Sequence, residues 1–155
     1  MKLSDLTLPN DEFSSDDILS DWRWLVGDEA CAMVVTKTGD TFLEKSDGVY
    51  FLSLGENRLE RICDSIDGFK QHLASRDFVS ARFLPHFLDE FIASGHALGT
   101  SQVIGFKLPP TTGGSFGIDN LEPTDVSIHF SILGQIARKI KDLPDGTPIG
   151  KFTIE

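Results

Sequence analysis

The first apolar pattern in the chain has the period of a helix. Ile18, Trp22 and Leu25 recur at intervals of three and four residues, which is the spacing of one helix face. Serine and aspartate residues stand directly before them and at their start, as is typical of a helix N-terminus. The pattern therefore predicts a short helix over residues 16–25, preceded by a loose acidic arm over residues 1–13. Because Trp22 and Trp24 are two positions apart on that helix, we expect one of them to be exposed.

From residue 30 onward the apolar residues come in short runs rich in β-branched and aromatic side chains, which favour strands. Ser46–Gly48 separates two such runs, and its glycine supplies the positive φ that tight hairpin turns require. The pattern predicts a meander of three to four antiparallel strands. The expected strands are 30–36, 41–45, 49–54 and 58–63.

The second half returns to helical spacing. Ser65 is a plausible cap for the first of these helices, and Pro85 is expected to break the second, because proline lacks an N–H and crowds the preceding turn. Two further strands and a long helix follow. The expected elements are helices over 65–73, 77–94 and 125–141, and strands over 101–108, 120–123 and 149–154.

The order of these elements shows no repeating strand–helix–strand unit. It predicts an α+β fold in which an antiparallel sheet, made of the meander and C-terminal strands, packs against about four helices. We divide the chain into an N-terminal arm and short helix over 1–29 and an α+β domain over 30–155. Together they are expected to form one compact unit.

The charge balance excludes some functions. Aspartate and glutamate number 24 against 14 lysine and arginine residues, giving a formal net charge of −10, which argues against nucleic acid as a partner. The N-terminus does not have the pattern of a signal peptide, and the sequence has no run of apolar residues long enough to span a membrane. These observations favour a cytoplasmic protein without a membrane partner. Cys31 and Cys63 lie in apolar contexts and are expected to be buried free thiols.

Few residues offer catalytic chemistry. The four histidines are not spaced as metal ligands, so neither a metal nor a cofactor is expected. Gly113, Ser115 and Gly117 match the Gly-x-Ser-x-Gly pattern of a nucleophile elbow, but two prolines precede this loop and no helix pattern follows it. We therefore assign no catalytic residue, and keep open a small hydrolase or ligand-binding protein that uses residues 113–117 and His129.

Acidic residues and one tryptophan are the better candidates for binding. An acidic face accelerates encounters with a basic partner, and a tryptophan is a common interface anchor. The candidate partner-binding residues are Asp16, Asp17, Asp21, Trp22, Asp28, Glu29, Asp119, Glu122 and Asp125.

Several short strings in the second half carry a resemblance to a known family. They are Gly105-Phe106-Lys107-Leu108-Pro109-Pro110, Gly113-Gly114, Asp119-Asn120-Leu121, Asp125, Gly134-Gln135 and Leu143-Pro144-Asp145-Gly146-Thr147, and residues 35–43 look like the opening hairpin. This set resembles the C-terminal domain of bacterial type VI secretion immunity proteins that neutralise DNase effectors, a former domain of unknown function. The resemblance covers residues 30–155. Its motif residues with an expected structural role are Gly105, Pro109, Gly113, Gly114, Asn120, Gly134, Pro144 and Gly146.

The resemblance implies a protein that binds a partner and carries out no reaction. The implied partner is a secreted antibacterial toxin, with a nuclease as the implied class, bound through the acidic surface. Besides the hydrolase or ligand-binding alternative, a regulatory scaffold that binds a protein other than a toxin remains open.

Overall fold

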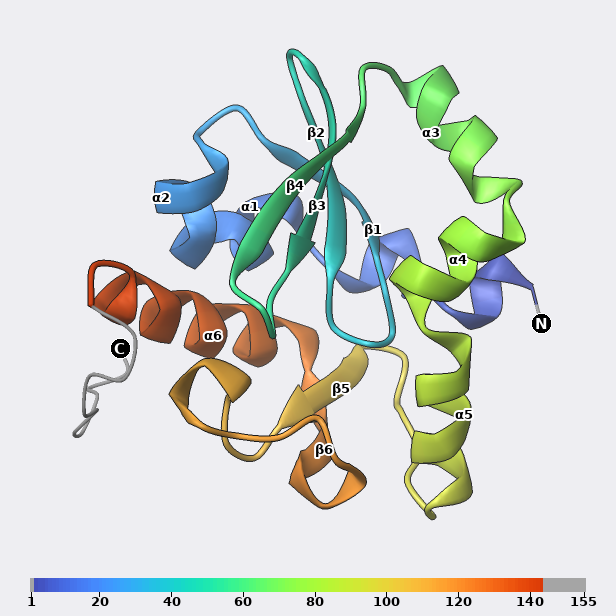
Figure 1. Ribbon diagram of the computed structural model, residues 1–155, viewed down its shortest axis with the longest axis vertical. Coiled ribbons are helices and arrows are strands. Elements are labelled where there is room, and N and C mark those ends of the chain that lie inside the picture. The colour runs from blue at the N-terminus through green and yellow to red at the C-terminus, as the bar shows by residue number, and fades with distance from the viewer. Residues whose placement is uncertain (1, 144–155) are drawn as a thin grey trace.

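The computed structural model describes residues 2–143, and its centre is an antiparallel meander in which each strand pairs with the next (Figure 1). The strands are β1 (Cys31–Val35), β2 (Thr41–Lys45), β3 (Gly48–Ser53) and β4 (Arg58–Cys63). Gly48 closes the hairpin at φ +146°, and a Cβ there would lie 2.3 Å from the carbonyl oxygen of Cys63. The predicted meander and its hairpin are confirmed.

The two central strands of this sheet, β2 and β3, bury side chains on both faces. Phe42 and Phe51 are paired across β2 and β3 and point to one face, while the adjacent Leu43 and Leu52 point to the other. All four side chains are buried, and a strand covered on both faces has this continuous apolar sequence. The sheet therefore lies between two sets of helices.

The helices on the Phe42 face follow directly after the meander. They are α3 (Ile66–Leu73), α4 (Arg76–Phe83) and α5 (Pro85–Ala93). The Ser65 hydroxyl accepts a hydrogen bond from the Gly68 N–H at 3.0 Å, as expected for a cap. Leu84 takes a left-handed conformation at φ 53° and Pro85 begins α5, so the predicted break at this proline is confirmed.

The Leu43 face is covered by the N-terminal segment and by the last helix. These elements are α1 (Ser15–Leu19), the 3-10 turn η3 (Ser20–Trp22), α2 (Arg23–Val26) and α6 (Val126–Ile140). The prediction of one helix over 16–25 is wrong, because the chain tightens into a 3-10 turn at its middle. The Ser20 hydroxyl donates to the Asp17 carbonyl at 3.0 Å within that turn, a local bond that competes with regular helix.

The loose N-terminal arm is also not observed. Leu6 and Leu8 are buried, and the Leu8 N–H donates to the Val35 carbonyl at 2.9 Å. The segment thereby pairs with part of the free edge of β1, where it also contains two short 3-10 turns, η1 (Leu3–Asp5) and η2 (Asn10–Glu12).

The later strands form a second sheet of two strands rather than an extension of the meander. They are β5 (Gln102–Phe106) and β6 (Leu121–Asp125), with the 3-10 turns η4 (Pro110–Thr112) and η5 (Ile118–Asn120) between them. β5 contacts the meander at the turn between β1 and β2, where the Ile104 N–H donates to the Lys37 carbonyl at 2.8 Å. The α+β class is as predicted, and the expected strand over 149–154 lies outside the described residues.

The two cysteines lie at the ends of the meander. Cys31 and Cys63 are free thiols, but Cys31 is exposed and Cys63 half-buried, so the expectation of burial is wrong. Cys31 is the first residue of β1, and its side chain points away from the core. Within residues 2–143, no helix is both long and apolar enough to cross a membrane.

Candidate partner-binding surface

Four of the predicted acidic residues come together where the N-terminal helices cross the start of α6. Asp17 accepts a hydrogen bond from the Ser127 hydroxyl at 2.5 Å, and Asp21 accepts one from the Ser131 hydroxyl at 2.7 Å. Ser127 and Ser131 are one helical turn apart, so both carboxylates lie along the same side of α6. Asp125 caps that helix by accepting from the Ser127 N–H at 2.9 Å.

The fourth member of this group is Asp16, which is adjacent to Asp17 and almost fully exposed. Its carboxylate lies 3.1 Å from the Arg23 guanidinium. An ion pair this exposed is screened by water and contributes little to stability. Asp16 and Asp17 are both exposed, and they are therefore available to a partner in solution.

The remaining predicted acids are distributed over other parts of the surface. Glu122 is exposed on β6 and lines a surface pocket together with Ile128 of α6, itself 53 % exposed. Asp119 is exposed in η5. Asp28 and Glu29 precede β1, and Glu29 accepts from the Ser46 hydroxyl of the β2–β3 turn at 3.2 Å. The structure thus places the pair 28–29 beside the hairpin and not beside α6.

Trp22 does not belong to this surface. It is completely buried, its indole N–H donates to the Phe130 carbonyl at 2.9 Å, and its ring stacks on Trp24 at 6.1 Å between centroids. The irregular η3 turn lets both rings pack together, which the ideal-helix argument did not anticipate. Trp24 is half-buried, so neither tryptophan is a fully exposed anchor.

The glycine motifs of the second half stand at close approaches of the backbone. A Cβ on Gly134 would lie 2.7 Å from the Asp21 carbonyl oxygen, and one on Gly105 would lie 2.2 Å from the Thr124 hydroxyl. A Cβ on Gly114 would overlap the Leu108 carbonyl at 1.7 Å. Gly105, Gly114 and Gly134 therefore occupy positions where a larger residue would displace its neighbours.

The loop between β5 and β6 is held by one side chain. Asn120 accepts from the Leu108 N–H and donates to the carbonyls of Leu108 and Ser115, at 2.7–2.9 Å. Pro109 contributes a carbonyl that accepts from the N–H groups of Thr112 and Gly114.

Gly113 in the same loop has φ +105°, a conformation that favours glycine. Two further motif residues, Pro144 and Gly146, lie outside the described residues.

The candidate hydrolase residues are engaged separately. The Ser115 hydroxyl accepts from the Gly117 N–H at 3.2 Å, whereas the buried His129 ring lies 2.9 Å through Nε2 from the Gly39 carbonyl. With Nε2 as the donor, Nδ1 carries no proton. Burial lowers the pKa of His129 to about 4, so the ring is neutral near pH 7. No group of three histidine, cysteine, aspartate or glutamate residues within 2–143 is arranged to hold a metal ion.

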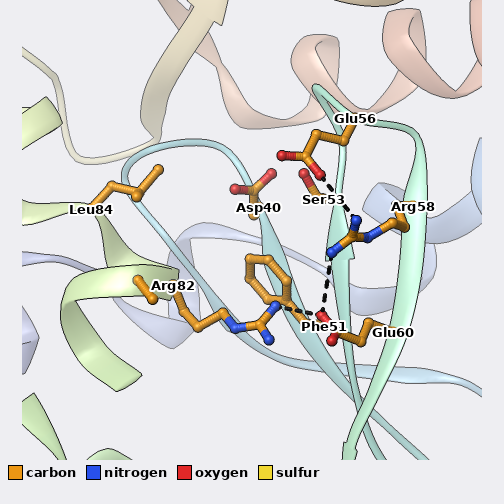
Figure 2. A pocket seen from close by; sticks show the side chains of 9 residues that line it. Asp40, Phe51, Ser53, Glu56, Arg58, Glu60, Arg82 and Leu84 are labelled. Atoms are coloured by element: carbon orange, nitrogen blue, oxygen red, sulfur yellow. Dashed lines mark hydrogen bonds and ion pairs between the residues drawn. The ribbon is translucent and has the colours of Figure 1, made fainter. Parts of the chain in front are cut away.

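A pocket of about 280 Å³ lies between β3, β4 and the end of α4, and its charged residues were not singled out by the sequence. Figure 2 shows Arg82, Glu60, Arg58 and Glu56 around its rim. Arg82 lies 2.6 Å from Glu60, and Arg58 lies 3.8 Å from both Glu60 and Glu56. The Arg82 hydrogen bond lowers the pKa of Glu60, so Glu60 stays ionised.

Asp40 lines this pocket beside Ser53 and Glu56, and its carboxylate accepts from the Leu54 N–H at 2.9 Å (Figure 2). Burial, opposed by this hydrogen bond and reinforced by the charge of Glu56, raises the pKa of Asp40 to about 7. In the sequence Asp40 looks like an ordinary turn residue after Gly39. Only the folded positions of β3 and β4 reveal its environment.

Comparison with known proteins bears on the second half of the chain. Residues 63–137 match the family model described as T6SS immunity protein Tdi1, C-terminal. The match runs from the last residue of β4 into α6, and so covers a shorter segment than the resemblance suggested. None of the curated proteins compared with the chain matches it. Over residues 63–137, the chain is therefore similar to the C-terminal domain of the T6SS immunity protein Tdi1.

Proposed function

We propose that this protein is a cytoplasmic immunity protein that neutralises a secreted antibacterial toxin by binding it. The observation that carries this proposal is the match of residues 63–137 to the family model of the T6SS immunity protein Tdi1, C-terminal. The placement of Ser115 and His129 agrees with a role in binding, since each is hydrogen bonded to its own backbone partner and not to the other. Inhibition by occupancy requires no chemical step from the immunity protein.

The acidic group beside α6 is proposed as the surface that first meets the toxin. A nuclease that cleaves DNA needs a basic cleft to hold phosphates, and a negatively charged protein is drawn toward such a cleft. Asp16 and Asp17 are exposed there, and the whole chain has a net charge of −10. This proposal makes a basic nuclease the expected class of toxin.

The binding role is tested with the product of the neighbouring gene. The two proteins are co-expressed with an affinity tag on one of them and purified, and the molar mass of the product is measured by light scattering. A stable complex of defined stoichiometry is expected. If the neighbouring product is toxic, folds and yet never co-purifies with this chain, the proposed function is wrong.

The acidic surface is tested by association kinetics. The double variant Asp16→Asn with Asp17→Asn removes two charges but preserves hydrogen-bond acceptors. We expect its association rate to fall about three- to tenfold at low salt. The matched control is Asp89→Asn with Glu90→Gln on α5, where both residues are exposed. An equal fall in both double variants would assign the effect to net charge and remove the case for this surface.

A further inference from the structure

The charged side chains around the pocket of Figure 2 form an alternating series. Glu56, Arg58, Glu60 and Arg82 follow one another, with ion-pair distances of 3.8, 3.8 and 2.6 Å. Two carboxylates and two guanidinium groups balance each other. The Arg82 guanidinium is held further by the Phe51 ring, 5.1 Å from its centroid.

Asp40 also lines this pocket, and its carboxylate has no positively charged partner in the series. None of the ion pairs formed within residues 2–143 includes it. One carboxylate oxygen accepts from the Leu54 N–H, and Figure 2 shows the side chain directed toward the pocket beside Ser53 and Glu56. A recessed carboxylate without a cation is costly in the free protein, and an added cation would complete the charge balance.

The walls next to Asp40 are apolar. Leu84 lines the pocket and is 37 % exposed. Its backbone is in the left-handed conformation directly before Pro85. A second pocket of about 200 Å³ shares Asp40, Ser53, Glu56 and Leu84 and adds aromatic rings. Among these rings, Phe116 is 52 % exposed and meets Phe106 edge-on.

We propose that this pocket receives an arginine side chain of the protein partner, with its guanidinium paired to Asp40. Guanidinium is weakly hydrated, donates to carboxylates in a fixed fork and stacks on aromatic faces. The unbalanced carboxylate therefore lies beside the apolar and aromatic surface that suits this group. That the partner is a protein rests on the proposed function. The chemistry of the pocket does not depend on it.

The charges that face Asp40 come from several elements. Glu56 stands in the β3–β4 turn, Arg58 and Glu60 on β4, and Arg82 on α4, while His129 of α6 contacts the adjacent Gly39 and stays neutral near pH 7. Since Asp40 has a raised pKa when the pocket is empty, a bound arginine favours its ionised form. Binding then releases a proton, and affinity for the partner increases with pH up to about 7 and levels off above it.

The isolated full-length chain provides a test that needs no partner. The Asp40 carboxyl carbon and the Leu54 amide are followed by NMR while N-acetyl-arginine amide is added, with N-acetyl-citrulline amide as the uncharged control of similar shape. We expect saturable shifts and a lower Asp40 pKa with the arginine compound alone. No saturable shift, or equal shifts with both compounds, overturns the proposal.

The second arm uses the complex with the neighbouring gene product. Asp40→Asn retains an acceptor for Leu54, and we expect it to weaken affinity about tenfold or more and to remove the pH dependence below 7. Asp89→Asn is the control for net charge. An unchanged affinity in Asp40→Asn would contradict the arginine pocket but not the proposed function. Failure of the wild-type chain to form any complex would contradict the proposed function, and the NMR titration would then decide whether the pocket binds arginine.

Discussion

At the scale of single residues, Asp40 and His129 titrate abnormally and in opposite directions. The pKa of Asp40 is raised to about 7 and that of His129 is lowered to about 4. Asp40 binds more protons in the folded state, so its contribution to stability is present below pH 4 and is lost as the pH rises through 7. His129 binds fewer protons when folded, so its contribution is lost as the pH falls below about 6.5. Between about pH 4 and 6.5 the two effects oppose each other.

The first prediction concerns Asp40→Asn. At pH 8 the folded protein must keep the carboxylate ionised in its recess, so the neutral amide should raise the free energy of unfolding by about 1–3 kcal/mol. At pH 4 the wild-type carboxyl is protonated when folded, and the gain should disappear. Urea denaturation at the two pH values measures the difference. A gain of equal size at both would contradict the assigned titration.

The sequence was informative at this scale only where a residue acts through its neighbours in the chain. The caps of Ser65 and Asp125 depend on the next three residues and were predictable. Trp22 is buried under α6, where its indole donates to the Phe130 carbonyl, and Asp40 is recessed where it accepts from the Leu54 N–H. Both environments depend on residues outside the local sequence. No local pattern carries that information.

At the scale of elements, η3 packs tightly against α6. Gly134 allows it, since the Asp21 carbonyl and the Trp22 indole nitrogen lie 2.7 and 2.9 Å from where its Cβ would be. The acidic group beside α6 depends on this contact, because the same approach brings Asp21 to Ser131. Element positions were largely predictable from periodicity. The separation of β5 and β6 into their own sheet was not, because strand pairing depends on contacts between segments that are distant in the sequence.

The second prediction concerns this helix contact. Gly134→Ala should lower the free energy of unfolding by about 1–3 kcal/mol, because overpacking exceeds the gain in helix propensity. The matched control is Gly68→Ala in α3, where the nearest atom to the added Cβ is the Ser65 hydroxyl at 3.3 Å. That variant should be neutral or stabilising by up to about 1 kcal/mol. Thermal denaturation in which both variants behave alike would count against a tight contact at Gly134.

The third prediction concerns the junction of α4 and α5. Leu84 has φ 53°, so Leu84→Gly should relieve backbone strain and raise the free energy of unfolding by about 1 kcal/mol. Ala81→Gly, at an exposed position inside α4, should instead lower it by about 1 kcal/mol. Chemical denaturation of the two variants compares these signs. Equal losses in both would show that Leu84 is not strained.

At the scale of the whole molecule, the two helix layers expose different chemistry. The N-terminal helices and α6 present the acidic group, whereas α4 and the sheet enclose the pocket at Asp40. Composition alone indicated an acidic protein, but the arrangement of its charges required the fold. The short strings between residues 105 and 135 indicated the similarity to the immunity-protein family, because they are turn and packing residues that can be recognised in the sequence.

The fourth prediction concerns long-range electrostatics. The association rate of the proposed complex should fall about tenfold or more between about 50 mM and 500 mM NaCl, because salt screens charges that are separated by more than a few ångströms. The dissociation rate should change less. Stopped-flow measurements at several salt concentrations separate the two rates, and a salt-independent association rate would contradict steering by the acidic surface.

The central claim, that this chain protects a cell by binding a toxin, is tested most directly by growth. Cells that express the neighbouring gene product are followed with and without this protein. We predict that growth stops without it, recovers when the wild-type chain is co-expressed, and recovers less with Asp40→Asn at equal protein levels. A toxin that arrests growth equally whether or not the folded wild-type chain is present would contradict the claim.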